Sequence, residues 1–166
     1  MKNSVYISIG SNIGDKIENI STVINEIKKT IGEVNLTSSN YKSDPLGFNS
    51  NETFINAVIC IQTKYNPTEL IKELQIIEKK MGRTRSHNKG YTDRIIDLDI
   101  IYFNDEIVNT IELKIPHTNL YFRKFVLIPL NEIAPNYIDP LKKTTIKELL
   151  EICPDESILE KVINNN

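Results

Sequence analysis

Residues 94–103 read Arg94-Ile95-Ile96-Asp97-Leu98-Asp99-Ile100-Ile101-Tyr102-Phe103, and this stretch decides the fold. It is rich in β-branched and aromatic residues and alternates in polarity, which predicts a strand. Side chains on a strand alternate between the two faces of its sheet, so Asp97 and Asp99 share one face and Leu98 lies on the other. The two carboxylates are expected about 6–7 Å apart along the strand. They repel each other unless a positive charge lies near them.

A divalent cation is one way to balance this acid pair. Mg²⁺ binds one or two carboxylates and keeps its other positions for water and phosphate oxygens. Residues 79–94, which end at the start of the strand, contain six Lys/Arg, one His and a single acid. Carboxylates for a metal beside arginines for phosphate are typical of phosphoryl-transfer sites. A solvated acid pair beside an ordinary basic surface loop is the other interpretation, and the pair alone does not decide between them.

Composition limits the classes of function. The 166 residues are enough for one domain with its own core, and 40% hydrophobic with 25% charged residues is ordinary for a globular protein. The net charge of −2 gives no overall attraction to nucleic acid or membrane. Cys60 and Cys153 are too far apart in sequence to indicate a zinc site or a disulfide framework. The N-terminus lacks an apolar signal segment. We expect a cytoplasmic, soluble monomer that binds neither nucleic acid nor membrane.

Hydrophobic spacing along the rest of the chain predicts strands and helices in alternation. Strands are expected at residues 5–9, 34–41 and 54–65, and helices at residues 17–31, 67–81 and 144–152. Gly32 and Gly82 are expected to end the first two helices, and Thr144 or Thr145 to cap the last with Glu148. The strand at 94–103 is expected to form a hairpin through Asn104-Asp105 to Ile107-Val108, and from Leu113 the chain is punctuated by prolines.

This order of elements predicts the fold class. Strand–helix–strand–strand–helix–strand is the ferredoxin-like βαββαβ plan. We therefore expect an α+β sandwich with an added C-terminal hairpin and helix. Many functions share this fold, so the fold alone does not identify one.

Other segments allow two interpretations each. The glycine turn at residues 10–15 resembles a phosphate loop, but it lacks the G-K-[ST] signature, so a tight turn with a helix cap is favoured. Gln75 and Glu78 share a helix face, which is normally a solvated face but could contact a nucleotide, since it lies just before the basic loop. Phe54 and Asn56 share a strand face and could hold a flat heterocycle, or simply line the core. A lone histidine such as His117 is more often structural than catalytic, and beside Arg123 it could instead donate a hydrogen bond to phosphate.

Together these segments resemble one enzyme family. The motifs that carry the resemblance are, in chain order, Tyr6-Ile7-Ser8-Ile9-Gly10-Ser11-Asn12, Tyr41-Lys42-Ser43-Asp44-Pro45-Leu46-Gly47, Phe54-Ile55-Asn56-Ala57-Val58, Glu78-Lys79-Lys80-Met81-Gly82-Arg83, Arg94-Ile95-Ile96-Asp97-Leu98-Asp99-Ile100, Ile115-Pro116-His117, Arg123-Lys124-Phe125-Val126-Leu127 and Pro129-Leu130-Asn131-Glu132-Ile133-Ala134-Pro135. Over residues 6 to about 135, the chain is similar to 6-hydroxymethyl-7,8-dihydropterin pyrophosphokinase of folate biosynthesis.

The resemblance implies a reaction and a set of site residues. It implies transfer of pyrophosphate from ATP to 6-hydroxymethyl-7,8-dihydropterin, giving AMP and the pterin diphosphate. Asp97 and Asp99 match the ligands of two Mg²⁺ ions, and Arg83 and Arg94 match mobile-loop arginines that assist transfer. The positions that match ATP contacts are Gln75, Glu78, Arg85, Ile100, His117 and Arg123. The positions that match the pterin pocket are Ser43, Pro45, Gly47, Phe54, Asn56 and Phe125, with the pterin stacked between the two phenylalanines.

The chain departs from the family pattern at two places. The family's mobile loop often contains Trp-Gly-Pro-Arg, whereas residues 89–94 here read Lys89-Gly90-Tyr91-Thr92-Asp93-Arg94 and the chain has no tryptophan. Tyr91 is the candidate to replace the aromatic side chain that shields the nucleotide. Thr118 stands where some members have an aromatic residue after the histidine.

Two other classes of function match parts of the sequence. A ferredoxin-like RNA-binding module would use the basic loop, but it would also need the K/R-G-F/Y-G/A-F-V-x-F/Y pattern, which the sequence lacks. A metal-dependent nuclease or nucleotidyltransferase would use the acid pair. That enzyme would act on nucleic acid or a nucleotidyl acceptor and would bind no pterin.

Overall fold

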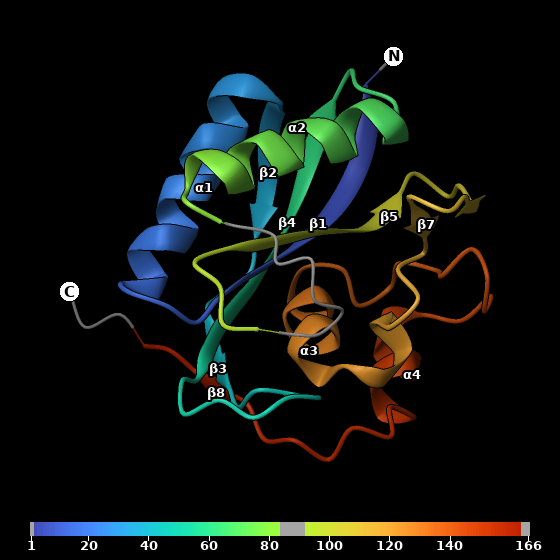
Figure 1. Ribbon diagram of the computed structural model, residues 1–166. Coiled ribbons are helices and arrows are strands. Elements are labelled where there is room, and N and C mark those ends of the chain that lie inside the picture. Colours follow the sequence, from blue (N-terminus) through green and yellow to red (C-terminus); the bar gives the residue numbers. More distant parts are fainter. Residues whose placement is uncertain (1, 84–91, 164–166) are drawn as a thin grey trace.

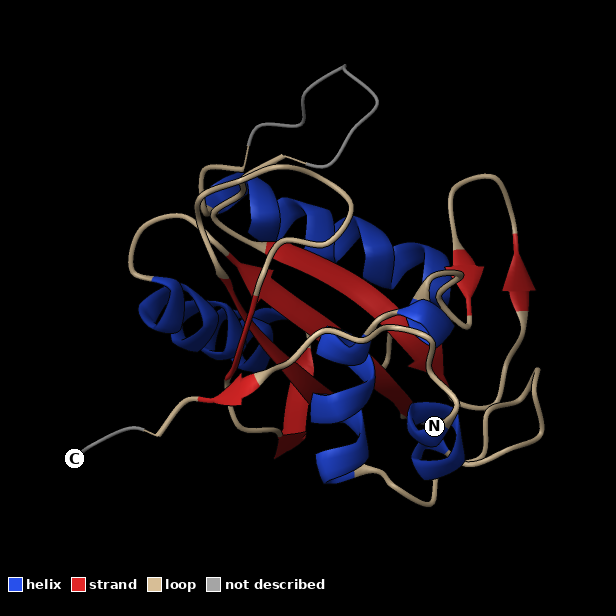
Figure 2. Ribbon diagram, turned by 90° about the horizontal axis from the view of Figure 1, so that it is seen from below, coloured by secondary structure: helices blue, strands red, loops and turns tan. Residues whose placement is uncertain are grey.

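The computed structural model describes residues 2–83 and 92–163, in which a six-stranded antiparallel sheet lies between two layers of helices (Figures 1 and 2). The strands of this sheet are β1 (Asn3–Ser11), β2 (Gly32–Thr37), β3 (Tyr41–Ser43), β4 (Phe54–Thr63), β5 (Asp97–Phe103) and β8 (Glu160–Lys161). The helices are α1 (Lys16–Thr30), α2 (Pro67–Lys80), α3 (Lys124–Ile133) and α4 (Ile146–Glu151), with a short 3₁₀ turn at Leu120–Phe122. This architecture is α+β.

Strand β1 lies in the middle of the sheet and fixes its geometry. The strand order is β5-β1-β4-β3-β8, and β2 also pairs with β4. Gly10 of β1 lies opposite Asn56 of β4 on one side and opposite Asp97 of β5 on the other. Two residues earlier in β1, Ser8 lies opposite Asp99. Side chains two residues apart share a face, so these polar residues gather on one face of the sheet.

Helices α1 and α2 cover the other face of the sheet (Figure 1). Both begin at side-chain caps. Asp15 accepts a hydrogen bond from the backbone N–H of Glu18, and Asn66 forms a capping box with Glu69 next to Pro67. The buried stripes of both helices pack against the apolar side chains of the strands; these residues are Ile20, Val23, Ile27, Leu70, Leu74, Ile77, Val5, Ile7, Ile9, Ala57, Ile59, Ile61, Leu98 and Ile100. No helix of the described residues is both long and apolar enough to cross a membrane.

Helices α3 and α4 pack on the same face as the polar residues and form a second core. Its buried residues include Val58, Ile101 and Tyr102 of the sheet, together with Val126, Leu127 and Leu130 of α3 and Ile146 and Leu149 of α4. Thr145 caps α4 in a capping box with Glu148, as predicted from the sequence. Because α3 covers only part of this face, the polar ends of β1, β4 and β5 stay open beside it.

The C-terminal segment ties α3 to the edge of the sheet. Asp155 accepts a hydrogen bond from the backbone N–H of Lys124, the first residue of α3, at 2.8 Å. Farther along, β8 pairs with β3, and Lys161 lies 3.6 Å from Glu132 of α3. Glu132 also accepts the Tyr41 hydroxyl of β3 at 2.8 Å. This segment therefore links two elements that flank the polar face.

Three sequence predictions differ from the structure. The predicted hairpin between residues 94–103 and Ile107-Val108 is wrong, because β6 (Val108–Asn109) pairs with β7 (Lys114–Ile115) instead. The turn after β5 is drawn toward β1, since Asn104 exchanges two hydrogen bonds with Ser4. The predicted strand 34–41 is divided into β2 and β3 by residues 38–40, and β5 begins at Asp97 rather than Arg94.

Helix α3 was not predicted, because Pro129 lies inside it. Proline lacks the N–H that the helix ladder needs, so a proline-punctuated segment indicates loops. The apolar residues Val126, Leu127 and Leu130 nevertheless recur at helical spacing and are buried. Burial of this stripe outweighs the loss of one hydrogen bond in a ten-residue helix.

Asp139 is a fully buried carboxylate that holds the second core together. It accepts hydrogen bonds from the Tyr102 hydroxyl at 2.6 Å and the Tyr121 hydroxyl at 2.8 Å. It also accepts the backbone N–H groups of Leu141 and Lys142, both at 2.7 Å. The second core thus includes a polar network in which one carboxylate accepts all four of these hydrogen bonds.

We predict that Asp139→Ala destabilises the protein by about 3 kcal/mol, because it leaves two tyrosine hydroxyls and two N–H groups without their acceptor. Urea unfolding followed by circular dichroism measures this loss. Asp105→Ala is the matched control, since Asp105 is exposed and its removal should change the unfolding free energy by less than about 0.5 kcal/mol. Equal effects of the two substitutions would contradict the network's role.

Candidate active site

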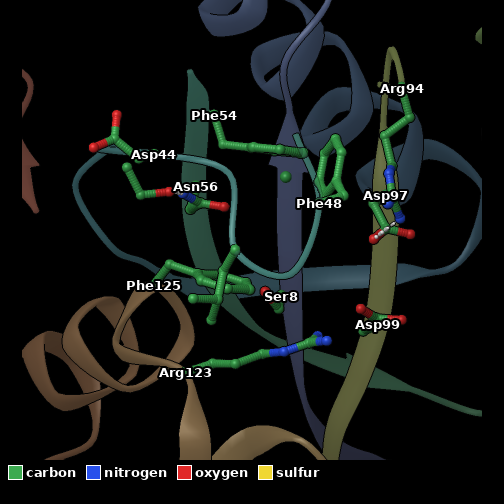
Figure 3. Close-up of a pocket in the computed structure, with 13 residues that line it drawn as sticks. Ser8, Asp44, Phe48, Phe54, Asn56, Arg94, Asp97, Asp99, Arg123 and Phe125 are labelled. Carbon is green, nitrogen blue, oxygen red and sulfur yellow. Dashed lines mark hydrogen bonds and ion pairs between the residues drawn. The ribbon is translucent and has the colours of Figure 1, made fainter. Parts of the chain in front are cut away.

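Two arginines hold the first carboxylate of the acid pair. Asp97 and Asp99 both extend from β5 into a pocket on the open face of the sheet (Figure 3). Asp97 Oδ1 lies 2.6 Å from Arg83 Nη1, and Asp97 Oδ2 lies 2.8 Å from Arg94 Nη1. Burial lowers the pKa of Arg83, but the charges of Asp97 and Glu78 together raise it by more, so the net shift is upward. Arg83 therefore stays charged beside Asp97.

Glu78 contacts both Arg83 and the backbone of β5 beside the acid pair. It lies in the last turn of α2, is only 2% exposed, and accepts the backbone N–H of Leu98 at 2.8 Å. It also forms an ion pair with Arg83. Glu78 thus fixes both Arg83 and the start of β5. The sequence suggested an ATP contact for Glu78, and the structure places this residue behind the acid pair, outside the set that lines the pocket.

Asp99 is the less compensated member of the pair. Its surroundings raise its pKa to about 7, first through burial and then through the negative charges of Asp97 and Glu78. His117 Nε2 lies 3.9 Å from Asp99 Oδ1, which is too long for a hydrogen bond. Burial and the nearby Arg123 lower the pKa of His117, so this ring is neutral near pH 7 and adds no positive charge. The charges of Arg123 and Arg83 lower the pKa of Asp99, but they do not cancel the upward shift.

The other half of the pocket is aromatic. Phe54 and Phe125 lie on opposite sides of the opening in Figure 3, with Asn56 between them. The Asn56 amide is buried and donates a hydrogen bond to Ser43 Oγ at 2.8 Å, which fixes its orientation. Gly10 forms the floor, where an added Cβ would lie 3.3 Å from Asn56 Oδ1 and 3.8 Å from the Phe54 ring. A side chain at position 10 would crowd this pocket.

The loop after β3, whose residues 45–47 were expected to form a pocket rim, also supplies pocket residues that the sequence did not indicate. Asp44, Leu46 and Phe48 line the pocket, and the Phe48 ring meets the Phe54 ring edge-on at a centroid distance of 6.0 Å. The flanking residues Pro45 and Gly47 were predicted instead. They shape the turn, in which Gly47 has a φ of 86°, but they are not among the residues that line the pocket. No periodic signal marks which residues of an irregular loop face inward.

Of the remaining predicted residues, Arg123 lines this pocket and two others lie away from it. Arg123 lines it from the start of α3, and its Cζ lies 5.4 Å from the centroid of the Phe125 ring (Figure 3). Ile100 is buried in the core on the opposite face of β5. Gln75 is exposed on α2, and Arg85 lies outside the described residues. Ser8 and Gly10 were missed as site residues, although their strand face could have been inferred once the pairing of β1 with β5 was known.

The chain matches one family model over residues 6–135, that of 7,8-dihydro-6-hydroxymethylpterin-pyrophosphokinase. The chain belongs to this family. The family is named for pyrophosphokinase activity on 7,8-dihydro-6-hydroxymethylpterin. The family assignment made from the sequence motifs is therefore confirmed.

Relatives differ in how much of their length the chain covers. It is 36% identical to the 2-amino-4-hydroxy-6-hydroxymethyldihydropteridine pyrophosphokinase of Haemophilus influenzae, over 95% of this chain and 97% of that protein. It is 38% identical to the folic acid synthesis protein FOL1 of Dictyostelium discoideum, over 89% of this chain but only 22% of that protein. The chain thus spans about a fifth of the length of some relatives and nearly all of others.

A solved structure shares the fold. The crystal structure of wild-type Plasmodium falciparum HPPK-DHPS with SDX-DHP superposes with a TM-score of 0.74, covering 91% of this chain and 44% of that chain, at 17% identity. At that identity the likeness concerns the fold alone.

The raised pKa of Asp99 predicts a pH-dependent effect on stability. Folding lifts this pKa from 3.8 to about 7, so the stability that the protonated carboxyl contributes is present below pH 4 and is lost as the pH rises through 7. We expect Asp99→Asn to stabilise the metal-free protein at pH 8 by about 1 kcal/mol, discounted for solvent screening, and to change nothing near pH 4. The effect is small because the Asp99 side chain is 38% exposed and water screens its charge.

Thermal unfolding in a chelating buffer at the two pH values measures this difference. The matched control is Asp105→Asn, an amide substitution at an exposed aspartate. An equal gain for Asp99→Asn at both pH values would mean that the charge of Asp99 is not the cause.

Proposed function

We propose that this chain transfers the β,γ-pyrophosphoryl group of ATP to the hydroxymethyl oxygen of 6-hydroxymethyl-7,8-dihydropterin and releases AMP. The observation that carries this proposal is the juxtaposition, in one pocket, of the Asp97–Asp99 pair with the aromatic half formed by Phe54 and Phe125. A charged half suits polyphosphate, and a flat aromatic half suits a fused heterocycle. The two reactants would then meet where the halves join.

The donor set fits Mg²⁺. Two carboxylates on one strand face are a ligand set that Mg²⁺ uses when phosphates and water supply its other positions. At Asp99, burial and the charges of Asp97 and Glu78 outweigh the opposing charges of Arg123 and Arg83, so its pKa is raised. We propose that Asp97 and Asp99 hold two ions together with ATP. Bound there, the ions would neutralise phosphate charge and orient the phosphates.

The aromatic half suits the pterin. Phe54 and Phe125 would stack on the two faces of the ring, and the Asn56 and Ser43 side chains would meet its polar edge. Both polar side chains are buried, and they are hydrogen-bonded to each other at 2.8 Å, so they are oriented before a ligand arrives. In this proposal the loop carrying Pro45 and Gly47 shapes the rim, and its Phe48 lies against Phe54.

The arginines would serve the transferring group. In the structure, Arg83 and Arg94 neutralise Asp97. We propose that both exchange this partner for phosphate oxygens when ATP is bound, since charge on those oxygens changes during transfer. Arg123, beside Asp99, would contact the nucleotide. By resemblance to the family, we propose that five further residues serve ATP binding: Gln75, Glu78, Arg85, Ile100 and His117. Glu78 would act through Arg83.

The proposal extends to the whole molecule. The chain order β1-α1-β2-β4-α2-β5 and the sheet order β5-β1-β4-β2 support a ferredoxin-like βαββαβ plan, with the hairpin β6–β7, α3 and α4 added. We propose one pyrophosphokinase domain over residues 1–166, acting as a cytoplasmic monomer on these two small substrates.

The products of the reaction test the proposal. The protein is incubated with ATP, Mg²⁺ and 6-hydroxymethyl-7,8-dihydropterin, and the nucleotides are separated. AMP should form in equal amount with a pterin diphosphate, and none should form without the pterin. ADP as the main pterin-dependent product would overturn the assignment of pyrophosphoryl transfer. Asp97→Asn and Asp99→Asn should fold but lose turnover by at least about a hundredfold, since each removes a metal ligand.

The arginines should affect rate more than binding. We expect Arg83→Ala and Arg94→Ala to lower kcat by about a hundredfold and to weaken binding of a non-hydrolysable ATP by less than about fivefold, because they act mainly in the transition state. Single-turnover kinetics and calorimetry separate the two quantities. Lys124→Ala, which removes a cation next to the site residue Arg123, is the control. A loss confined to ATP affinity would contradict the proposed role.

A further inference from the structure

Asn12 is a buried polar residue that the reaction as described does not use. It follows β1 directly, in the glycine turn at residues 10–15, and it is 0% exposed. The sequence suggested either a phosphate loop or a plain turn for this segment. The structure gives Asn12 a different set of partners, all in the segment that precedes β5.

Asn12 binds both backbone polar groups of Arg94 and the side chain of Asp93. Its backbone N–H donates to the Arg94 carbonyl at 3.1 Å, and its Oδ1 accepts the Arg94 N–H at 2.7 Å. Its Nδ2 donates to Asp93 Oδ1 at 2.7 Å. The regular pairing of β1 with β5 ends at Gly10 and Asp97, so Asn12 extends the connection beyond the last ladder pair.

This arrangement fixes the main chain from which the Arg94 side chain projects. The Arg94 guanidinium donates to Asp97 Oδ2 at 2.8 Å, and its Nε donates to the Thr92 carbonyl at 2.9 Å. The second bond is local, so it turns with the segment and cannot hold it to the sheet. The three bonds to Asn12 do hold it, because Asn12 is anchored in the core at the end of β1.

We propose that Asn12 is a positioning residue for Arg94 in the transfer reaction. Holding Arg94 before ATP binds removes conformational freedom that the transition-state complex would otherwise have to restrict. This inference rests on the proposed function of Arg94. It assigns Asn12 no contact with either substrate.

The central test exchanges the hydrogen-bond donor, Asn12, and the acceptor, Asp93. Asn12→Asp keeps an acceptor for the Arg94 N–H but sets a second carboxyl against Asp93. We expect kcat to fall about 30-fold with the pterin KM changed less than twofold, since misplacement of a catalytic group mainly affects the rate. The double variant Asn12→Asp/Asp93→Asn restores a donor–acceptor pair and should recover kcat to within about threefold. Asn25→Asp, the same change at an exposed position of α1, should leave kcat unchanged.

Hydrogen exchange reports the position of Arg94 independently of activity. The Arg94 amide should be protected in the wild type and in Asn25→Asp, and should exchange at least tenfold faster in Asn12→Ala. If Asn12→Ala does not fold, Asp93→Ala serves instead, because Asp93 is exposed and its loss removes only the Nδ2 bond. We expect that variant to lower kcat about threefold. A kcat that stays at the wild-type value, or that falls while protection of the Arg94 amide is unchanged, would overturn the inference.

The same experiments separate this inference from the proposed function. If the wild type forms no AMP from ATP and the pterin, the proposed function fails, whatever Asn12 does to the Arg94 amide. If the wild type forms AMP and the exchanged pair shows no recovery, the proposed function stands and the role of Asn12 fails.

Discussion

The pairing of β1 with β4 on one side and β5 on the other is the constraint on which the site depends. It sets Gly10 between Asn56 and Asp97, so the amide of the aromatic half and the carboxylate of the charged half lie two strands apart. A shift of one residue in the β5 pairing would turn both aspartates toward α1 and α2, where apolar packing would exclude them. The core on that face therefore holds the chemistry on the other face in place.

The two aspartates on the open face differ in how well nearby positive charges balance them. Asp97 has two arginine partners, whereas Asp99 has a neutral histidine at 3.9 Å, and the charges of Arg123 and Arg83 only partly offset those of Asp97 and Glu78 around it. A protein selected only for stability would not keep such a group in a pocket. A site that binds a charged ligand keeps some charges without a full set of opposite charges until the ligand binds. This lowers the stability of the free protein, and packing in the core offsets the loss.

Local sequence signals predicted much of the fold. The alternation of residues 97–100 gave the face of the acid pair, and Asn66 with Glu69 and Thr145 with Glu148 marked two helix starts. Helix α3 was missed because Pro129 contradicts its apolar spacing, and the false hairpin was predicted because the bonds between Asn104 and Ser4 join residues a hundred positions apart. The contacts of Asn12 with Arg94 are equally non-local. Such partners become visible only when the strands are assembled.

The two ends of the described chain lie at unequal distances from the pocket. Strand β1 begins at Asn3 and reaches the pocket floor at Gly10, roughly 20 Å farther along at about 3.3 Å per residue. At the other end, β8 is hydrogen-bonded to β3, whose Ser43 orients Asn56, and Asp155 holds the start of α3 between Arg123 and Phe125. Mechanical load on the C-terminal segment, from an attached domain or a surface tether, would therefore pass into both walls of the aromatic half, whereas load on the N-terminal segment would enter the sheet far from it.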